Sequence, residues 1–92
     1  MKLKLTADER KALVAYLEGS EDCEKLNEKE WILDIYDNDT PISLDLVFNR
    51  DSVFADGAEY LKYDEGMDGW FMSGPIDTAD DVLKILRAAE VI

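Results

Sequence analysis

The stretch WILDIYDNDTPISLDLVFN, residues 31–49, decides the fold, because it reads as two β-strands joined by a turn. In its second half, apolar residues occupy every other position: Ile42, Leu44, Leu46 and Phe48. Successive side chains of a strand point to opposite faces, so this alternation predicts a strand over 42–49 with one buried face. A shorter strand is predicted over 31–37. Between the two, Asn38-Asp39-Thr40-Pro41 carries side chains that favour turns.

Helical patterns lie at both ends of the chain. Thr6-Ala7-Asp8-Glu9 is a capping box and predicts a helix over 7–18, which Gly19 is expected to end in the left-handed conformation. Thr78 is expected to cap a second helix. The predicted buried stripe of that helix is Val82, Ile85, Leu86 and Ala89. Residues 20–26 are interpreted as a possible short helical turn.

Two further strands are predicted over 59–64 and 69–73, joined by a glycine-bearing loop. Residues 50–58 are interpreted as irregular or as a short extra element. The order α-β-β-β-β-α predicts an α+β fold, in which a three- to four-stranded antiparallel meander has an N-terminal and a C-terminal helix packed on one face. At this length we expect a single compact acidic α+β domain spanning 1–92.

The acidic charge is concentrated in the middle of the chain. The formal net charge is −12, and residues 34–81 hold 13 of the 22 acidic residues but only two basic ones, Arg50 and Lys62. Such a charge repels nucleic-acid phosphates and anionic lipid, so we expect no direct nucleic-acid or membrane binding. It attracts basic proteins and speeds their association. The alternative is that the acids serve solubility alone.

No catalytic or cofactor motif accompanies these acids. The chain has no histidine and one cysteine, which removes the usual triads and ordinary zinc sites. Asp37-Asn38-Asp39 begins like a calcium-binding loop, but the fifth, sixth and twelfth positions hold Pro41, Ile42 and Phe48 instead of ligands. We therefore expect a protein that is not an enzyme and that uses no cofactor and no metal.

The single Cys23 fits a reducing, cytoplasmic location, and its acidic neighbours are expected to raise the pKa of its thiol. The first residues lack the apolar run of a signal peptide, and no window approaches the roughly 18 apolar residues of a membrane span. The sequence leaves the choice between a monomer and a small homo-oligomer open.

Two helices cover only one face of the predicted sheet, so the other face is expected to be open. By alternation, the open face would show Ile32, Asp34, Tyr36, Asp45, Val47, Tyr60, Lys62 and Asp64. Carboxylates interleaved with tyrosines are typical of protein-binding surfaces, although an ordinary solvated face is the alternative. The predicted partner-binding residues, which include acids of the two turns, are Asp34, Tyr36, Asp37, Asp39, Asp45, Tyr60, Asp64, Glu65 and Asp68.

These patterns lead to one concrete functional hypothesis. The chain is expected to be a small acidic inhibitor or decoy that binds the basic, nucleic-acid-binding surface of a protein partner, its carboxylates standing in for phosphates. The expected partner is a nuclease or a nucleic-acid-handling complex. The class includes phage anti-defence proteins of the anti-CRISPR type and toxin-immunity proteins, which the sequence does not separate. The alternative is an accessory or assembly domain that uses the open sheet face, with the charge incidental.

Overall fold

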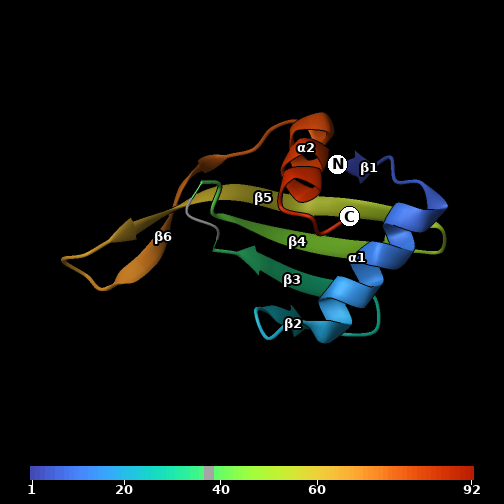
Figure 1. Ribbon diagram of the computed structural model, residues 1–92, viewed down its shortest axis with the longest axis horizontal. Coiled ribbons are helices and arrows are strands. Elements are labelled where there is room, and N and C mark those ends of the chain that lie inside the picture. Colours follow the sequence, from blue (N-terminus) through green and yellow to red (C-terminus); the bar gives the residue numbers. More distant parts are fainter. Residues whose placement is uncertain (37–38) are drawn as a thin grey trace.

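The structure is a computed structural model that describes residues 1–36 and 39–92. It contains short and long strands with one helix near each end (Figure 1). The elements are β1 Lys2–Leu3, α1 Ala7–Gly19, β2 Cys23–Lys25, β3 Glu30–Ile35, β4 Ile42–Asn49, β5 Ser52–Asp64, β6 Gly69–Pro75 and α2 Ala79–Ala88. The predicted strand over 42–49 is confirmed at both ends.

All strands pair antiparallel in one six-stranded sheet with the order β1-β5-β4-β3-β2, and β6 pairs with β5. The strands from β2 to β6 follow one another as a meander, and β1 lies beside the first half of β5. This confirms the predicted α+β fold with a helix at each end packed on the sheet. The predicted number of strands was too low, because β1 and β2 are too short to show an alternating pattern.

The long strand β5 resolves the uncertain region 50–58, because it runs through that region and the predicted strand 59–64. Its register against β4 shifts between Asp45 and Leu46, where Asp56 is the extra residue on β5. A second shift lies beyond Tyr60, where Ser73 is the extra residue on β6. Bulges bend and twist a strand. The β5–β6 hairpin accordingly projects past the ends of β3 and β4 (Figure 1).

One hydrophobic core lies between the sheet and the two helices. The apolar side of β4 forms its centre, since Ile42, Leu44 and Leu46 are at most 1% exposed. The helices contribute Leu13, Leu17, Val82, Leu83 and Leu86, all buried in the same cluster. Each helix therefore packs its apolar stripe on the same face of the sheet, and neither of the two described helices lies over the opposite face of β3 and β4 (Figure 1).

The capping box of α1 forms as predicted. The Glu9 backbone N–H donates to Thr6 Oγ1 and the Thr6 N–H donates to Glu9 Oε1, both at 3.1 Å. Glu9 also accepts from Arg87 of α2 at 2.9 Å, which joins the two helices and lowers the pKa of Glu9. The expected left-handed stop at Gly19 is wrong. Gly19 has no positive φ, and the helix instead ends at Ser20 in an extended conformation.

The interpretation of residues 20–26 as a helical turn is also wrong. Residues Cys23–Lys25 form the edge strand β2 and pair with Trp31–Leu33 of β3, a tertiary contact that overrides weak local preference. Burial raises the pKa of the Cys23 thiol, and the nearby charges of Asp22 and Asp34 raise it further, in the direction expected from the acidic sequence around it. Within the described part of the chain, no helix has the length and apolar character needed to cross a membrane.

Candidate functional site: the open face of the sheet

The face of the sheet opposite the helices is called the open face. The registers identify its members, because directly opposed residues on neighbouring antiparallel strands share a face. Asp34 lies opposite Ser43, Ile32 opposite Asp45, and Asp45 opposite Gly57, and each of these pairs alternates with a core pair such as Leu33 and Leu44. On the described strands β3 to β6 the only basic residue is Lys62.

The extra residue of β5, Asp56, moves the β5 residues that were predicted on the open face to the other side of the sheet. Tyr60 lies opposite Ile42, whose side chain is buried under the helices, so Tyr60 belongs to the helix side. By alternation Lys62 and Asp64 follow it, and the expectation that these three residues lie on the open face was wrong. Asp56 shifts the phase of β5 by one residue, and Glu59 takes a place on the open face beside Ser43.

Three aromatic rings meet where the hairpin leaves the sheet. The ring of Trp70 in β6 lies 5.3 Å, centroid to centroid, from both Tyr36 and Tyr63. All three side chains stay at least 40% exposed, and Met72, two residues along the same face of β6, is 65% exposed. These four residues are called the aromatic cluster. Of its members the sequence predicted only Tyr36 as part of the site.

Asp34 connects the acids of the open face to the aromatic cluster. Its Oδ1 accepts from Ser43 Oγ at 2.6 Å, and its Oδ2 accepts a longer bond from the Tyr36 hydroxyl at 3.4 Å. Loss of solvation raises the pKa of Tyr36, and the Asp34 charge raises it further. The tyrosine therefore remains a neutral donor at neutral pH. The carboxylate of Asp34 is in turn fixed in direction by its two donors.

Asp45 and Glu59 each have one carboxylate oxygen that accepts no hydrogen bond from the described residues. They line a shallow groove of about 220 Å³ on the open face together with Ile32, Ser43, Leu44, Gly57 and Met72. Asp45 Oδ1 and Glu59 Oε2 are both shielded from water, and neither has a hydrogen-bond partner among the described residues. Such an oxygen loses its hydration without compensation, which costs free energy in the free protein.

Glu30 adds a third acid beside Asp45. Loss of solvation raises the pKa of Glu30, and the charges of Asp45 and Asp56 raise it further. When protonated, Glu30 can donate to Asp45, so Glu30 binds its proton more tightly in the folded chain than in the unfolded one. No group of three or more acidic or thiol side chains among the described residues is arranged to hold a metal ion.

The raised pKa of Glu30 predicts how stability depends on pH. At Glu30 the folded state binds more protons than the unfolded state above the usual pKa of 4.5. The contribution of Glu30 to the free energy of unfolding is therefore full below pH 4.5 and is lost as pH rises through the folded pKa. We expect Glu30→Gln to raise the free energy of unfolding at pH 7 and to flatten its decrease above pH 4.5. Denaturant titrations across this range measure both effects.

The control for this experiment is Glu28→Gln, which neutralises an exposed loop residue close by in the sequence. It should leave the shape of the pH profile unchanged. If Glu28→Gln and Glu30→Gln alter the profile equally, the effect reflects the general negative charge of the chain and not the contact between Glu30 and Asp45.

The remaining predicted site residues lie at the two turns. Asp64 Oδ1 accepts from the backbone N–H groups of Gly66 and Met67, so it stabilises the hairpin turn and is less available to a partner. Asp68 accepts from the Tyr63 hydroxyl, and Glu65 is exposed. Asp39 is exposed beyond the end of β3, and Asp37 lies outside the described residues. The structure therefore separates two acidic regions, the open face and the hairpin tip.

The site residues that sequence reasoning missed are Trp70, Tyr63 and Met72 of the aromatic cluster, together with Glu59 and Glu30. One signal was present, since Trp70-Phe71-Met72 are consecutive apolar residues in a short strand next to a tight turn. In a sheet that helices cover on one face only, consecutive apolar residues leave at least one apolar side chain on the uncovered face. The positions of the two glutamates depend on pairing and left no local signal.

Comparison of the chain with protein families, with curated proteins and with solved structures finds no match.

Proposed function

We propose that the chain is a small acidic inhibitor that binds the basic, nucleic-acid-binding surface of a cytoplasmic protein partner through its open face. Carboxylates of β3, β4 and β5 take the places that phosphates occupy on the partner. The expected partner is a nuclease or a nucleic-acid-handling complex, in an anti-defence, anti-CRISPR-type role or a toxin-immunity role. The chain itself performs no reaction in this proposal.

The observation that carries the proposal is the unsatisfied pair of carboxylate oxygens on Asp45 and Glu59. Asp45 and Glu59 both line a groove that is partly apolar, with Ile32 and Met72 among its other lining residues. An arginine guanidinium is planar, carries five N–H donors and packs its stem on apolar surface, so it fits such a groove. Phosphate-binding surfaces are rich in this side chain. The partner's cations would pair with these two carboxylates.

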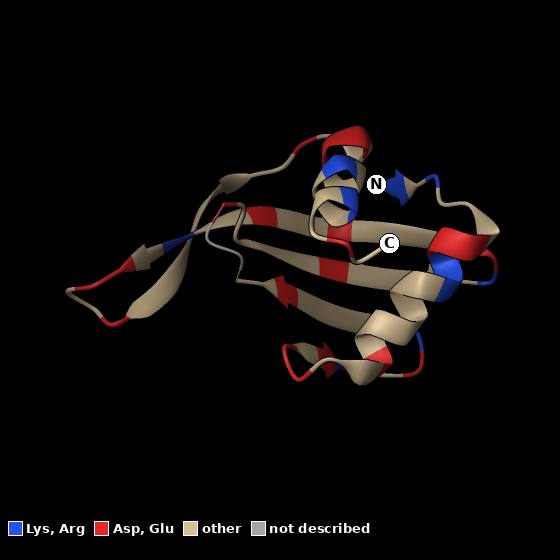
Figure 2. Cartoon of the chain, viewed as in Figure 1, with Lys and Arg blue, Asp and Glu red and all other residues tan. Residues whose placement is uncertain are grey.

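The aromatic cluster supplies the apolar part of the interface. Tyrosine, tryptophan and methionine are enriched at protein interfaces, where large rigid side chains bury area at low entropic cost. Trp70 and Met72 continue the open face beyond the acids of β3 and β4. Figure 2 shows acidic residues on β3, β4 and β5 and most basic residues on the helices and turns. The acids are expected to guide association, and the aromatic cluster to slow dissociation.

The proposal is tested by capture on the immobilised chain followed by competition. Proteins bound from a cell extract are identified, purified, and titrated with the chain between about 50 mM and about 500 mM salt. We expect a partner with a basic surface whose affinity falls steeply with salt. Duplex DNA or RNA should displace the chain from that partner, because both occupy the same surface.

Two results would contradict the proposal. One is a partner whose affinity is independent of salt and unaffected by nucleic acid. The other is direct binding of duplex DNA by the chain at physiological salt in a gel shift, since a phosphate mimic repels phosphate.

The exposed aromatic cluster favours one alternative, an accessory or assembly domain that binds through apolar contacts while the charge serves solubility. That function predicts salt-independent binding that is lost in Trp70→Ala but kept in Asp45→Asn. The inhibitor function predicts that both substitutions weaken binding and that only the loss caused by Asp45→Asn depends on salt.

A further inference from the structure

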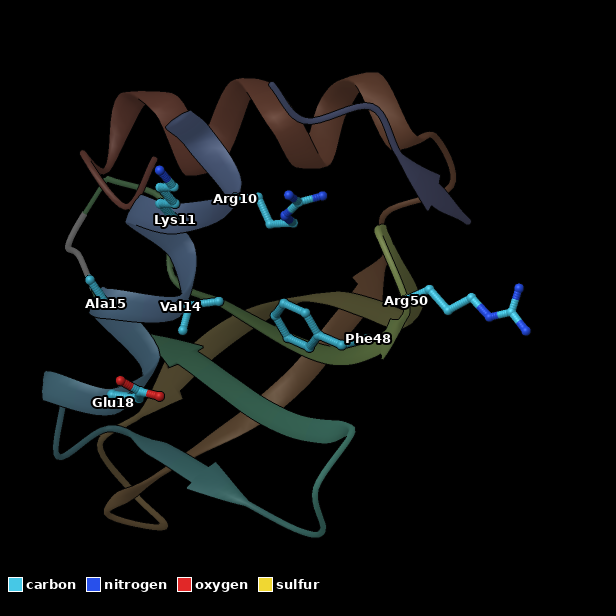
Figure 3. A pocket seen from close by; sticks show the side chains of 7 residues that line it. All are labelled: Arg10, Lys11, Val14, Ala15, Glu18, Phe48 and Arg50. Atoms are coloured by element: carbon cyan, nitrogen blue, oxygen red, sulfur yellow. The ribbon is translucent and has the colours of Figure 1, made fainter. Parts of the chain in front are cut away.

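A second surface, at the helix end of the molecule, has the opposite charge. A groove of about 480 Å³ lies between α1 and the end of β4 (Figure 3). Its apolar lining is Val14, Ala15 and Phe48, and Val14 is 36% exposed. This groove is called the basic groove, because the rest of its lining is mainly cationic: Arg10, Lys11 and Arg50, with Glu18 at the far end (Figure 3).

The basic groove is unusual in a chain with a net charge of −12, because three of its ten basic residues line one cavity. Arg10 donates to the backbone carbonyl of Asp51 at 3.1 Å, and its ion pair with the Asp51 carboxylate is long, at 3.7 Å, and 96% exposed on the aspartate side. A smaller cavity of about 210 Å³ continues the groove along α1, sharing Val14, Glu18 and Phe48 and adding Trp31. The combination of an apolar floor and cationic rim fits a short acidic segment that carries an apolar side chain.

The hairpin tip of this chain is such a segment. Residues 64–69 read Asp-Glu-Gly-Met-Asp-Gly, and Met67 at their centre is 81% exposed. The turn is held in place by Asp64, which accepts from the Gly66 and Met67 N–H groups, and by the bond from Tyr63 to Asp68. Because the tip is already ordered, binding through it loses little further conformational entropy.

The tip and the basic groove of one molecule cannot meet each other. The molecule measures 42 × 24 × 21 Å, and along its longest axis the β5–β6 hairpin lies at one end and α1 with the β4–β5 turn at the other (Figure 1). We propose that the hairpin tip of one copy binds in the basic groove of a second copy. Met67 packs on Val14 and Phe48, while Glu65 and Asp68 meet Arg10, Lys11 and Arg50.

This contact is heterologous, because different surfaces of the two copies meet, and repetition adds molecules head to tail. It goes beyond the proposed function, since it leaves Asp45, Glu59 and the groove of the open face free. A single turn buries less area than the roughly 1,200 Å² of a stable interface, so the association is weak. The attraction between its opposite charges also weakens with salt, because these charges lie at the rim, where ions screen them. The like net charge of the two copies opposes the contact and limits its strength further.

Sedimentation velocity of the purified chain up to about 0.5 mM, a range suited to weak interfaces, tests the proposal at low and high salt. We expect the average mass to rise with concentration at low salt and to stay monomeric at high salt. Two variants, Arg10→Glu/Lys11→Glu in the groove and Glu65→Lys/Met67→Lys at the tip, should each remain monomeric. An equimolar mixture of the two should associate again, since each reversed surface meets its complement.

The matched control is Lys29→Glu/Lys84→Glu, which changes the net charge by the same amount as the groove variant at two exposed residues outside the groove. It should associate as the wild-type chain does. Circular dichroism and thermal unfolding confirm that each variant is folded. A wild-type chain that stays monomeric at low salt overturns the proposal. Loss of association in the control, or no association in the mixture, does so too.

Discussion

Replacing Leu46 by alanine is expected to lower the free energy of unfolding by about 2–5 kcal/mol. Leu46 is fully buried at the centre of the sheet, between Trp31 of β3 and Ala55 of β5. Its removal leaves a cavity among close-packed neighbours that the small Ala55 side chain cannot fill. For a domain of this size the loss is a large part of the total stability, so chemical denaturation measures it directly.

The control is its neighbour on the other face, Asp45→Ala. Asp45 has a buried oxygen without a partner and lies beside the acid Glu30, so its removal should change the free energy of unfolding little. A similar loss in both variants would contradict the assignment of the two faces of β4. A small effect of Leu46→Ala alone would show that the core can collapse around the truncated side chain.

The fold was predictable where the sequence carries strong local signals. The capping box at Thr6 fixes the start of α1, and the alternation from Ile42 to Phe48 fixes β4 from end to end. Each signal involves residues that are close in sequence, so no knowledge of tertiary contacts was needed. The α+β class followed from the order of these elements alone.

The short strands could not be predicted in this way. β1 is two residues long, and its partners in β5, Val53 and Phe54, lie about fifty positions further along the chain. β2 is held by β3 alone, in a segment whose local pattern favours a turn. Both exist because a neighbouring strand offers free backbone N–H and C=O groups, a property of the assembled sheet and not of the segment.

The candidate site was predicted only in part, because its β5 residues also depend on strand pairing. Asp34 and Asp45 lie on strands with an unbroken alternation, and the register of β3 and β4 places them on the open face as expected. Tyr36 follows β3 directly, and its ring contacts Trp70. The β5 residues were assigned to the wrong face, because one extra residue, Asp56, reverses every position after it. A bulge of this kind has no signature in composition. Its consequence is that Glu59, and not Tyr60, joins the acids of the open face.

The largest effect on function is expected from reversing the charge of the open face. Asp45→Lys/Glu59→Lys places two cations where the proposed partner supplies its own, in a groove that both residues line and in which each has one oxygen shielded from water. Removing one member of a buried charge pair typically costs about 2–5 kcal/mol, and reversal adds repulsion. We therefore expect the affinity for the captured partner to fall by at least about 100-fold, measured by titration calorimetry or surface plasmon resonance.

The matched control carries the same change in net charge on two exposed loop acids outside the strands of the open face, Glu28→Lys/Asp77→Lys. Rim charges act mainly through association rate, so this variant should bind with a modestly slower on-rate and a nearly unchanged off-rate. Thermal unfolding shows whether both variants keep the fold. If the control abolishes binding and Asp45→Lys/Glu59→Lys does not, the binding surface lies on the helix and loop side. If both lose affinity equally through the on-rate, the partner senses the net charge of the chain rather than a built surface.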